Sequence, residues 1–131
     1  MDYFDPIEED GKLEDLKKSW LSSEYANRTP AAIEVPFESV VGGVLIRGRI
    51  DAVYETADGF EVVDWKTGSK QLGESAAIQL AMYRLAWAKL KNIDVTKVSA
   101  AFHYVPTSVT DKRADLLDEA ALVALIQKYN K

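Results

Sequence analysis

The stretch GRIDAVYETADGFEVVDWKTG, residues 48–68, decides the predicted fold, because it is typical of two strands joined by a tight turn. Asp58 and Gly59 form an Asp-Gly pair, which is the strongest short-range signal for a β-hairpin with a two-residue loop. With such a loop, Ala57 pairs with Phe60 across the hairpin. The register of every other pair follows from that first one.

Three charged side chains gather on one face of this predicted hairpin. Side chains alternate along a strand, so Asp64 and Lys66 share a face, and the register places Asp51 directly opposite Lys66 and diagonal to Asp64. Opposite Cβ atoms lie about 4.5–5.5 Å apart and diagonal ones about 7–8 Å. Two carboxylates and an ammonium on one patch could hold a divalent cation with the lysine beside it. The alternative is a surface hairpin with a cross-strand salt bridge, which contributes little.

The neighbouring residues favour a site over a surface ion pair. Residues 52–54 and 62–63 are apolar, as are Ile50 and Phe60, so the hairpin is expected to be buried on at least one face. Charged groups on a largely buried hairpin cost free energy unless they are paired or bind a metal. Gly48 lies just before the site, where a missing side chain allows close approach of another backbone or a substrate, or else marks a bulge.

The ordered set of motifs resembles the RecB-type nucleases of the PD-(D/E)XK, or restriction-endonuclease-like, superfamily. The matching residues are GRID at 48–51, DWKTG at 64–68, and Gln79 with Tyr83 on a predicted helix. The resemblance runs from about residue 33 to residue 105. No single motif is specific, but the ordered set with this spacing is fairly specific.

The resemblance implies a metal-dependent deoxyribonuclease that uses Mg²⁺ or Mn²⁺. Asp51 matches the first acid of the motif, and Asp64 with Lys66 matches its acid-X-lysine. Mg²⁺ usually takes one or two carboxylates plus waters and substrate oxygens, so these two aspartates are the expected ligands, and the backbone carbonyl of Trp65 is a third. Lys66 would orient or deprotonate the attacking water or stabilise the pentavalent phosphate. Taken alone, Gln79 favours a core glutamine bonded to backbone, but the resemblance implies that Gln79 and Tyr83 line the site and position the substrate.

Composition sets limits on function. The chain has 131 residues, 47% of them apolar and 28% charged, which suits one globular domain. Cysteine is absent, which excludes a cysteine-ligated iron–sulfur cluster and fits a cytoplasmic protein. The sequence has no apolar run long enough to span a bilayer. DNA is the expected partner, although a net charge of −5 argues against tight DNA binding by this chain alone.

The remaining elements complete a mixed α/β fold. Residues 1–11 are expected to form a loose lead-in, and residues 111–113 a charged turn. Helices are predicted over residues 12–26, 74–91 and 115–129, and strands over residues 33–39, 44–54, 60–65 and 98–105. Pro36 places the first strand at a sheet edge or makes it irregular there. Gly42-Gly43 is expected to form a second hairpin turn, between the first two strands. This α-β-β-β-α-β-α order is that of a restriction-endonuclease-like mixed sheet flanked by helices, in a single nuclease-like domain over residues 1–131.

The histidine content departs from the RecB-type pattern. Related nucleases commonly carry a histidine upstream of the first acid, whereas the single histidine here is His103, in an apolar strand where a structural role is expected. The chain is therefore expected to be a fragment of a longer protein, and the resemblance implies a DNA recombination or repair enzyme with a helicase domain or subunit as partner. Two alternatives stay open: a catalytically inactive relative that binds DNA or a partner protein, and an unrelated α/β interaction module.

Overall fold

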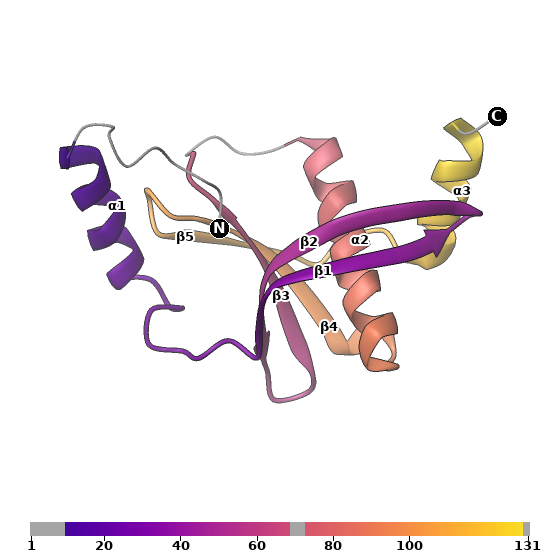
Figure 1. Cartoon of the computed structure of the whole chain (residues 1–131), viewed down its shortest axis with the longest axis horizontal. Coiled ribbons are helices and arrows are strands. Elements are labelled where there is room, and N and C mark those ends of the chain that lie inside the picture. Colours follow the sequence, from indigo (N-terminus) through magenta and orange to yellow (C-terminus); the bar gives the residue numbers. More distant parts are fainter. Residues whose placement is uncertain (1–9, 69–72, 130–131) are drawn as a thin grey trace.

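The computed structural model describes residues 10–68 and 73–129 and has one mixed sheet with helices on both sides (Figure 1). The elements in chain order are α1 (Asp10–Leu21), β1 (Ala32–Val41), β2 (Val44–Glu55), β3 (Phe60–Lys66), α2 (Glu74–Lys91), the 3₁₀ turn η1 (Val95–Lys97), β4 (Val98–Tyr104), β5 (Val109–Arg113) and α3 (Glu119–Tyr129). No helix among the described residues is long and apolar enough to cross a membrane.

The five strands lie in the order β1-β2-β3-β4-β5. The pair β3–β4 is parallel and the other three pairs are antiparallel, so α2 is the crossover that brings the chain back alongside β3. β1 is an edge strand, as Pro36 predicted. The mixed α/β fold class is thereby confirmed.

The fifth strand corrects one prediction. Residues 111–113, expected to form a charged turn, belong to β5, which pairs with β4 from Ala100↔Arg113 to Tyr104↔Val109. An edge strand contacts the sheet on one side only, so its sequence needs little apolar character. The polar run in β5 therefore resembles a turn in composition.

Two hairpins differ in how well their turns were predicted. Gly42 and Gly43 have φ angles of 59° and 80° and form the predicted two-residue turn between β1 and β2, which needs positive φ at both positions. The turn between β2 and β3 is longer than predicted, because Glu55 rather than Ala57 pairs with Phe60. The hydroxyl of Thr56 accepts a hydrogen bond of 3.1 Å from the N–H of Gly59 and thereby closes a four-residue loop.

The Gly59 position has a second constraint, from η1. A Cβ atom built on Gly59 would lie 2.0 Å from the carbonyl oxygen of Lys97. The glycine is therefore explained by the close packing of the turn against η1, and the Asp-Gly pair does not mark a two-residue loop here.

Helices cover the two faces of the sheet unequally. α2 packs against one face over a buried cluster that includes Val53, Val62, Leu80 and Phe102. The long β1–β2 hairpin curves over α2 toward α3, and Gly42 at its tip lies against Val123 of α3 (Figure 1). We call this side of the sheet the α2 face.

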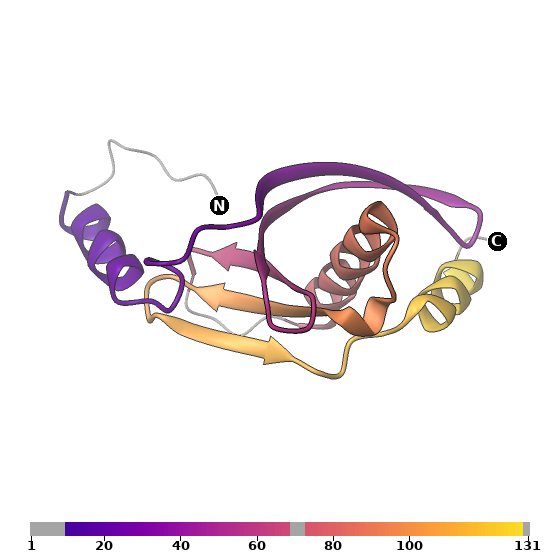
Figure 2. The ribbon, with the colours of Figure 1, turned by 90° about the horizontal axis from the view of Figure 1, so that it is seen from below.

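The opposite face of the sheet carries a smaller aromatic cluster. Tyr25, Tyr54 and Trp65 are buried there, and Trp20 of α1 packs against them. α1 stands at the end of the molecule opposite α3 (Figure 2). We call this side the rear face.

Helix boundaries differ modestly from the predictions. α2 has the predicted bounds. α1 ends at Leu21, before the predicted residue 26, in a turn where the N–H of Ser23 donates to the carbonyl of Trp20. α3 starts at Glu119, four residues later than predicted, because the carboxylate of Asp118 accepts a hydrogen bond from the N–H of Ala121 and caps the helix. The predicted lead-in falls mostly on residues 1–9, which lie outside the described residues.

Candidate active site

The candidate site lies where two strands part. β2 and β3 are paired from Glu55↔Phe60 to Ala52↔Val63, whereas β3 continues alongside β4 as far as Lys66↔Tyr104. Asp51 and Asp64 are the first residues beyond the last β2–β3 pair. The two carboxylates therefore lie on two strands that separate at this level. We call this point of separation between β2 and β3 the fork.

Irregular backbone accompanies the fork. β1 pairs with β2 on either side of Glu34 and Asp51, but these two residues are skipped. Glu34 has a φ of 47°, in the left-handed region that a non-glycine residue rarely adopts. Ile50 and Val53 both belong to the core cluster on the α2 face, so the alternation of faces along β2 is interrupted between them.

The observed register corrects the predicted partner of Asp51. Continuing from Ala52↔Val63 by one residue brings Asp51 level with Asp64, not with Lys66. The prediction was displaced by two residues because the turn holds two more residues than expected. A displacement by an even number keeps every side chain on its predicted face, so the acids and the lysine still converge.

Direct contacts join these residues. Nζ of Lys66 lies 3.1 Å from Oδ2 of Asp64, and the side chains are 23% and 9% exposed respectively. The backbone N–H of Trp65 donates a hydrogen bond of 2.9 Å to Oδ2 of Asp51. The structure therefore brings together Asp51, Asp64 and Lys66, and it places the Trp65 backbone between them.

The electrostatics of the pair favour a bound cation. Burial, together with a hydrogen bond to Asp51, raises the pKa of Asp64 to about 7, and the positive charge of Lys66 opposes this rise. The raised pKa means that ionising both of these adjacent carboxylates, which are largely shielded from water, costs free energy. A divalent cation between them would remove that cost.

The donor set fits a metal that keeps much of its hydration. Among the described residues, no group of three or more His, Cys, Asp or Glu side chains is arranged to hold a metal. Two carboxylates, with the Trp65 carbonyl between them in the chain, form a sparse oxygen set. Such a set suits Mg²⁺ or Mn²⁺, which complete their shells with water and substrate oxygens, and does not suit a closed structural site.

The predicted substrate-positioning residues lie on α2, which covers the same face of the sheet. Tyr83 is 9% exposed, and its ring lies edge-on to that of Phe37 on β1 at 5.6 Å. A Cβ atom on Gly48 would lie 2.8 Å from the Phe37 ring and 3.1 Å from the Tyr83 ring. Gly48 thus admits these two rings, whereas the sequence indicated a backbone, a substrate or a bulge at this position. Gln79 is exposed near the start of α2.

His103 lies apart from the acids, on the rear face. It is fully buried, its Nδ1 lies 2.8 Å from the hydroxyl of Thr110, and burial lowers the pKa of its ring. Its Nε2 has no hydrogen-bond partner in the part of the chain that the structure describes. This placement agrees with the structural role expected for His103.

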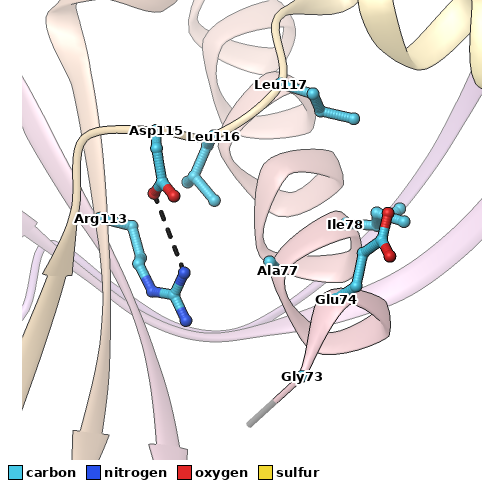
Figure 3. Close-up of a pocket in the computed structure, with 8 residues that line it drawn as sticks. All are labelled: Gly73, Glu74, Ala77, Ile78, Arg113, Asp115, Leu116 and Leu117. Atoms are coloured by element: carbon cyan, nitrogen blue, oxygen red, sulfur yellow. Dashed lines mark ion pairs between the residues drawn. The ribbon is translucent and has the colours of Figure 1, made fainter.

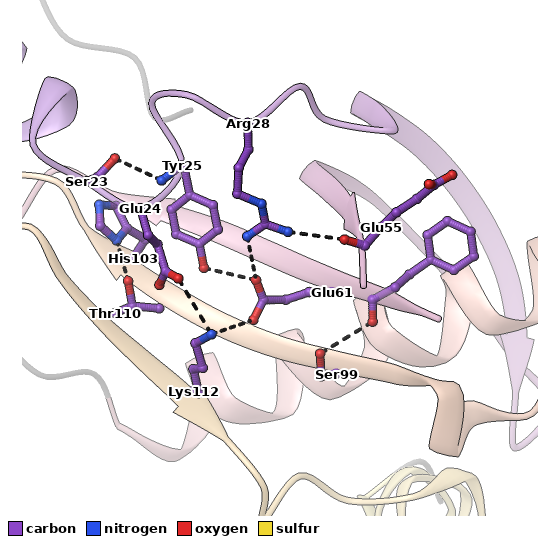
Figure 4. Close-up of polar contacts among 11 residues, drawn as sticks. Ser23, Glu24, Tyr25, Arg28, Glu55, Glu61, Ser99, His103, Thr110 and Lys112 are labelled. Atoms are coloured by element: carbon purple, nitrogen blue, oxygen red, sulfur yellow. Dashed lines mark hydrogen bonds and ion pairs between the residues drawn. The ribbon is translucent and has the colours of Figure 1, made fainter. Parts of the chain in front are cut away.

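Sequence reasoning missed a buried ion cluster centred on Glu61 (Figure 4). Glu61 is 4% exposed and accepts a hydrogen bond of 3.1 Å from the hydroxyl of Tyr25. Arg28 and Lys112 lie 4.0 Å and 3.6 Å from its carboxylate oxygens. Its partners come from two segments distant in the sequence, the α1–β1 connection and β5, so no local sequence signal could have identified the cluster.

A cavity of about 340 Å³ opens beside the first turn of α2 (Figure 3). Arg113 and Asp115 form an ion pair of 3.8 Å at its wall, and Glu74 adds a second acid. Neither Asp51 nor Asp64 lines it.

Comparison with known proteins agrees with this geometry. The family model described as the PD-(D/E)XK nuclease superfamily matches residues 10–129. The chain belongs to this superfamily. The predicted superfamily and its restriction-endonuclease-like fold are therefore confirmed.

Individual relatives of this PD-(D/E)XK chain cover it to different extents. The Gene 69 protein of Mycobacterium phage D29 is 40% identical over 74 residues, which are 56% of this chain and 26% of that protein. The chain thus matches about a quarter of the phage protein's length. The crystal structure of SSO0001 is 22% identical, with a TM-score of 0.49 over 90% of this chain and 57% of the other. Members of the PD-(D/E)XK superfamily are usually nucleases, which act on DNA and typically use divalent metals.

Proposed function

We propose that this chain is a nuclease domain that hydrolyses phosphodiester bonds in DNA with the help of Mg²⁺ or Mn²⁺. The observation that carries the proposal is the convergence of Asp51, Asp64 and Lys66 at the fork between β2 and β3. Superfamily membership supplies the reaction class. The local geometry supports the choice of these three residues as the site.

Each residue of the site has a distinct proposed role. Asp51 and Asp64 would hold the cation, with the backbone carbonyl of Trp65 as a third oxygen ligand. A bound Mg²⁺ or Mn²⁺ would supply Lewis-acid stabilisation of the phosphate and a lowered pKa for water. Lys66, 3.1 Å from Asp64, orients or deprotonates the attacking water or stabilises charge on the phosphate. Gln79 and Tyr83 position the substrate from α2.

We further propose that the domain is of the RecB type and works within a larger helicase–nuclease of DNA recombination or repair. The support is the ordered set of GRID, DWKTG, Gln79 and Tyr83 in the sequence. This part is tested on the parent protein. ATP-dependent unwinding coupled to cleavage supports it, and cleavage that is indifferent to ATP contradicts it.

A second candidate function is a catalytically inactive module that binds DNA or a partner protein. The observation in its favour is the sparse donor set, since two carboxylates are the only charged ligands that the described residues bring to the fork. The net charge of −5 favours a protein partner over DNA.

The deciding experiment measures cleavage of end-labelled and circular single- and double-stranded DNA by the chain at enzyme excess. Mn²⁺ or Mg²⁺ is compared with EDTA, and Asp64→Ala is compared with Asp58→Ala. Asp58 is an exposed acid in the β2–β3 turn and serves as the matched control. Metal-dependent cleavage that Asp64→Ala alone removes supports the nuclease. Absence of both cleavage and Mn²⁺ binding in this chain and in the parent protein supports the inactive module.

A further inference from the structure

The side chain of Trp65 points away from those of Asp64 and Lys66, which flank it in the sequence. It is 6% exposed and belongs to the aromatic cluster on the rear face. Its ring lies edge-on to Trp20 at 5.0 Å, to Tyr25 at 5.1 Å and to His103 at 5.7 Å. Edge-to-face pairs of this kind have a preferred geometry, so the cluster fixes the orientation of the Trp65 ring.

Two of these rings come from the segment that precedes the sheet. Trp20 lies in the last turn of α1, and Tyr25 follows in the connection to β1. Side-chain contacts fasten this segment: the Ser19 hydroxyl donates to the carbonyl of Pro106 at 2.8 Å, and the Tyr25 hydroxyl donates to Glu61 at 3.1 Å. Figure 4 shows Tyr25 between His103 and Glu61 on the rear face. α1 and the α1–β1 connection therefore pack against β3 on the rear face of the sheet.

The backbone of the same tryptophan reaches the site. The Trp65 N–H donates to Asp51, and Trp65 stands between Asp64 and Lys66 in the chain. β2 and β3 are no longer paired at this level, so this hydrogen bond links the two arms of the fork. A rotation of the Trp65 peptide would turn the N–H away from Asp51 and move both flanking side chains.

We propose that α1 sets the geometry of the acid pair through Trp20 and Trp65, which act as positioning residues on the face opposite to the chemistry. The expected effect on metal affinity rests on the proposed function, whereas the orientation of Asp51 by the Trp65 N–H does not depend on it. Packing of α1 fixes the position of the Trp65 ring. The fixed ring in turn holds the Trp65 peptide N–H in place, and this N–H orients Asp51 through its hydrogen bond. Groups that orient metal ligands in this way typically affect metal affinity by about 10- to 100-fold.

The test compares Trp20→Ala with Trp20→Phe and with Leu21→Ala in the 131-residue chain. Leu21 is the next residue of the same helix and is 70% exposed, so it reports the effect of an alanine in α1 without loss of the ring contact. The first measurement is hydrogen exchange of the Trp65 amide by NMR, relative to protected amides of the β1–β2 hairpin. The second is Mn²⁺ affinity by calorimetry.

We expect Trp20→Ala to speed exchange of the Trp65 amide selectively and to weaken Mn²⁺ binding on the order of tenfold. Trp20→Phe should restore most of both values, and Leu21→Ala should change neither. Unchanged exchange at Trp65, or a uniform increase at all protected amides, would overturn the proposal. Should Trp20→Ala fail to fold, Trp20→Leu replaces it in the same comparison. If neither the wild-type chain nor the parent protein binds Mn²⁺, the proposed function fails, while the exchange result still decides the positioning role.

Discussion

The ammonium of Lys66 lies 3.1 Å from the carboxylate of Asp64, two residues earlier on the same strand, and both side chains are mostly buried. The lysine thus has a fixed position beside the proposed cation rather than a solvated one. Its removal should impair the chemical step more than metal binding.

Lys66→Met should lower kcat on the order of 10²- to 10⁴-fold while Mn²⁺ still binds, because the loss concerns proton transfer or charge stabilisation. Single-turnover cleavage at saturating Mn²⁺, with calorimetry in parallel, measures the two effects separately. Lys128→Met on α3 is the matched control and should cleave normally. An equal loss of rate in both variants would argue against the role assigned to Lys66.

Asp51→Asn and Asp64→Asn should each weaken Mn²⁺ binding by more than about tenfold, since even groups that only orient metal ligands have effects of that size. Calorimetric titration of each variant checks this, with Asp58→Asn as the control for loss of one exposed acid. The site would be placed elsewhere if both variants bound Mn²⁺ as the wild type does.

His103 should make the folded state less stable in acid. Burial lowers its pKa below the ordinary value of about 6.5, so below that pH the unfolded chain binds a proton that the folded chain does not. The contribution of His103 to the unfolding free energy should therefore fall as pH drops below 6.5, by up to about 1.4 kcal/mol per pH unit. The raised pKa of Asp64 gives a contribution of opposite sign over the same range, so the His103 contribution is read from the difference between wild type and variant.

Urea unfolding between pH 5 and 8 measures this dependence in wild type and in His103→Leu. The variant should lack the part of the slope due to the imidazole. Thr110→Val removes the hydroxyl partner but keeps the ring, so it should retain the slope. Identical slopes in wild type and His103→Leu would show that other groups cause the acid sensitivity.

Gly59→Ala should lower the unfolding free energy by about 1–3 kcal/mol, because the new methyl group would collide with the Lys97 carbonyl. Gly68→Ala is the control, since a Cβ atom there meets no atom of the described residues within 4 Å, and it should stay within about 0.5 kcal/mol of wild type. Thermal unfolding of both variants, at pH 7 without metal, checks the comparison. Equal stability of the two variants would mean that η1 shifts to accommodate the methyl group at little cost in free energy.

The sequence was informative wherever the signal was local and periodic. The bounds of α2 and the Gly42-Gly43 turn were predicted correctly, and the common face of Asp51, Asp64 and Lys66 followed from strand alternation. Alternation has a period of two, which is why a register error of two residues left this face unchanged.

What the sequence could not show depends on contacts between distant segments. The length of the β2–β3 turn is set by the Thr56 hydroxyl and by η1, which follows forty residues later. The partners of Glu61 lie on the α1–β1 connection and on β5. β5 itself is polar because it is an edge strand, so its composition resembles that of a turn.

The parting of β2 from β3 gives the two acids different mechanical attachments. Asp64 lies within the central sheet, where β3 pairs with β4, whereas Asp51 lies on the strand that continues into the β1–β2 hairpin, whose tip lies against α3. The hydrogen bond from Trp65 to Asp51 therefore joins the hairpin to the central sheet at the site. The spacing of the carboxylates consequently depends on how these two parts of the fold are held together.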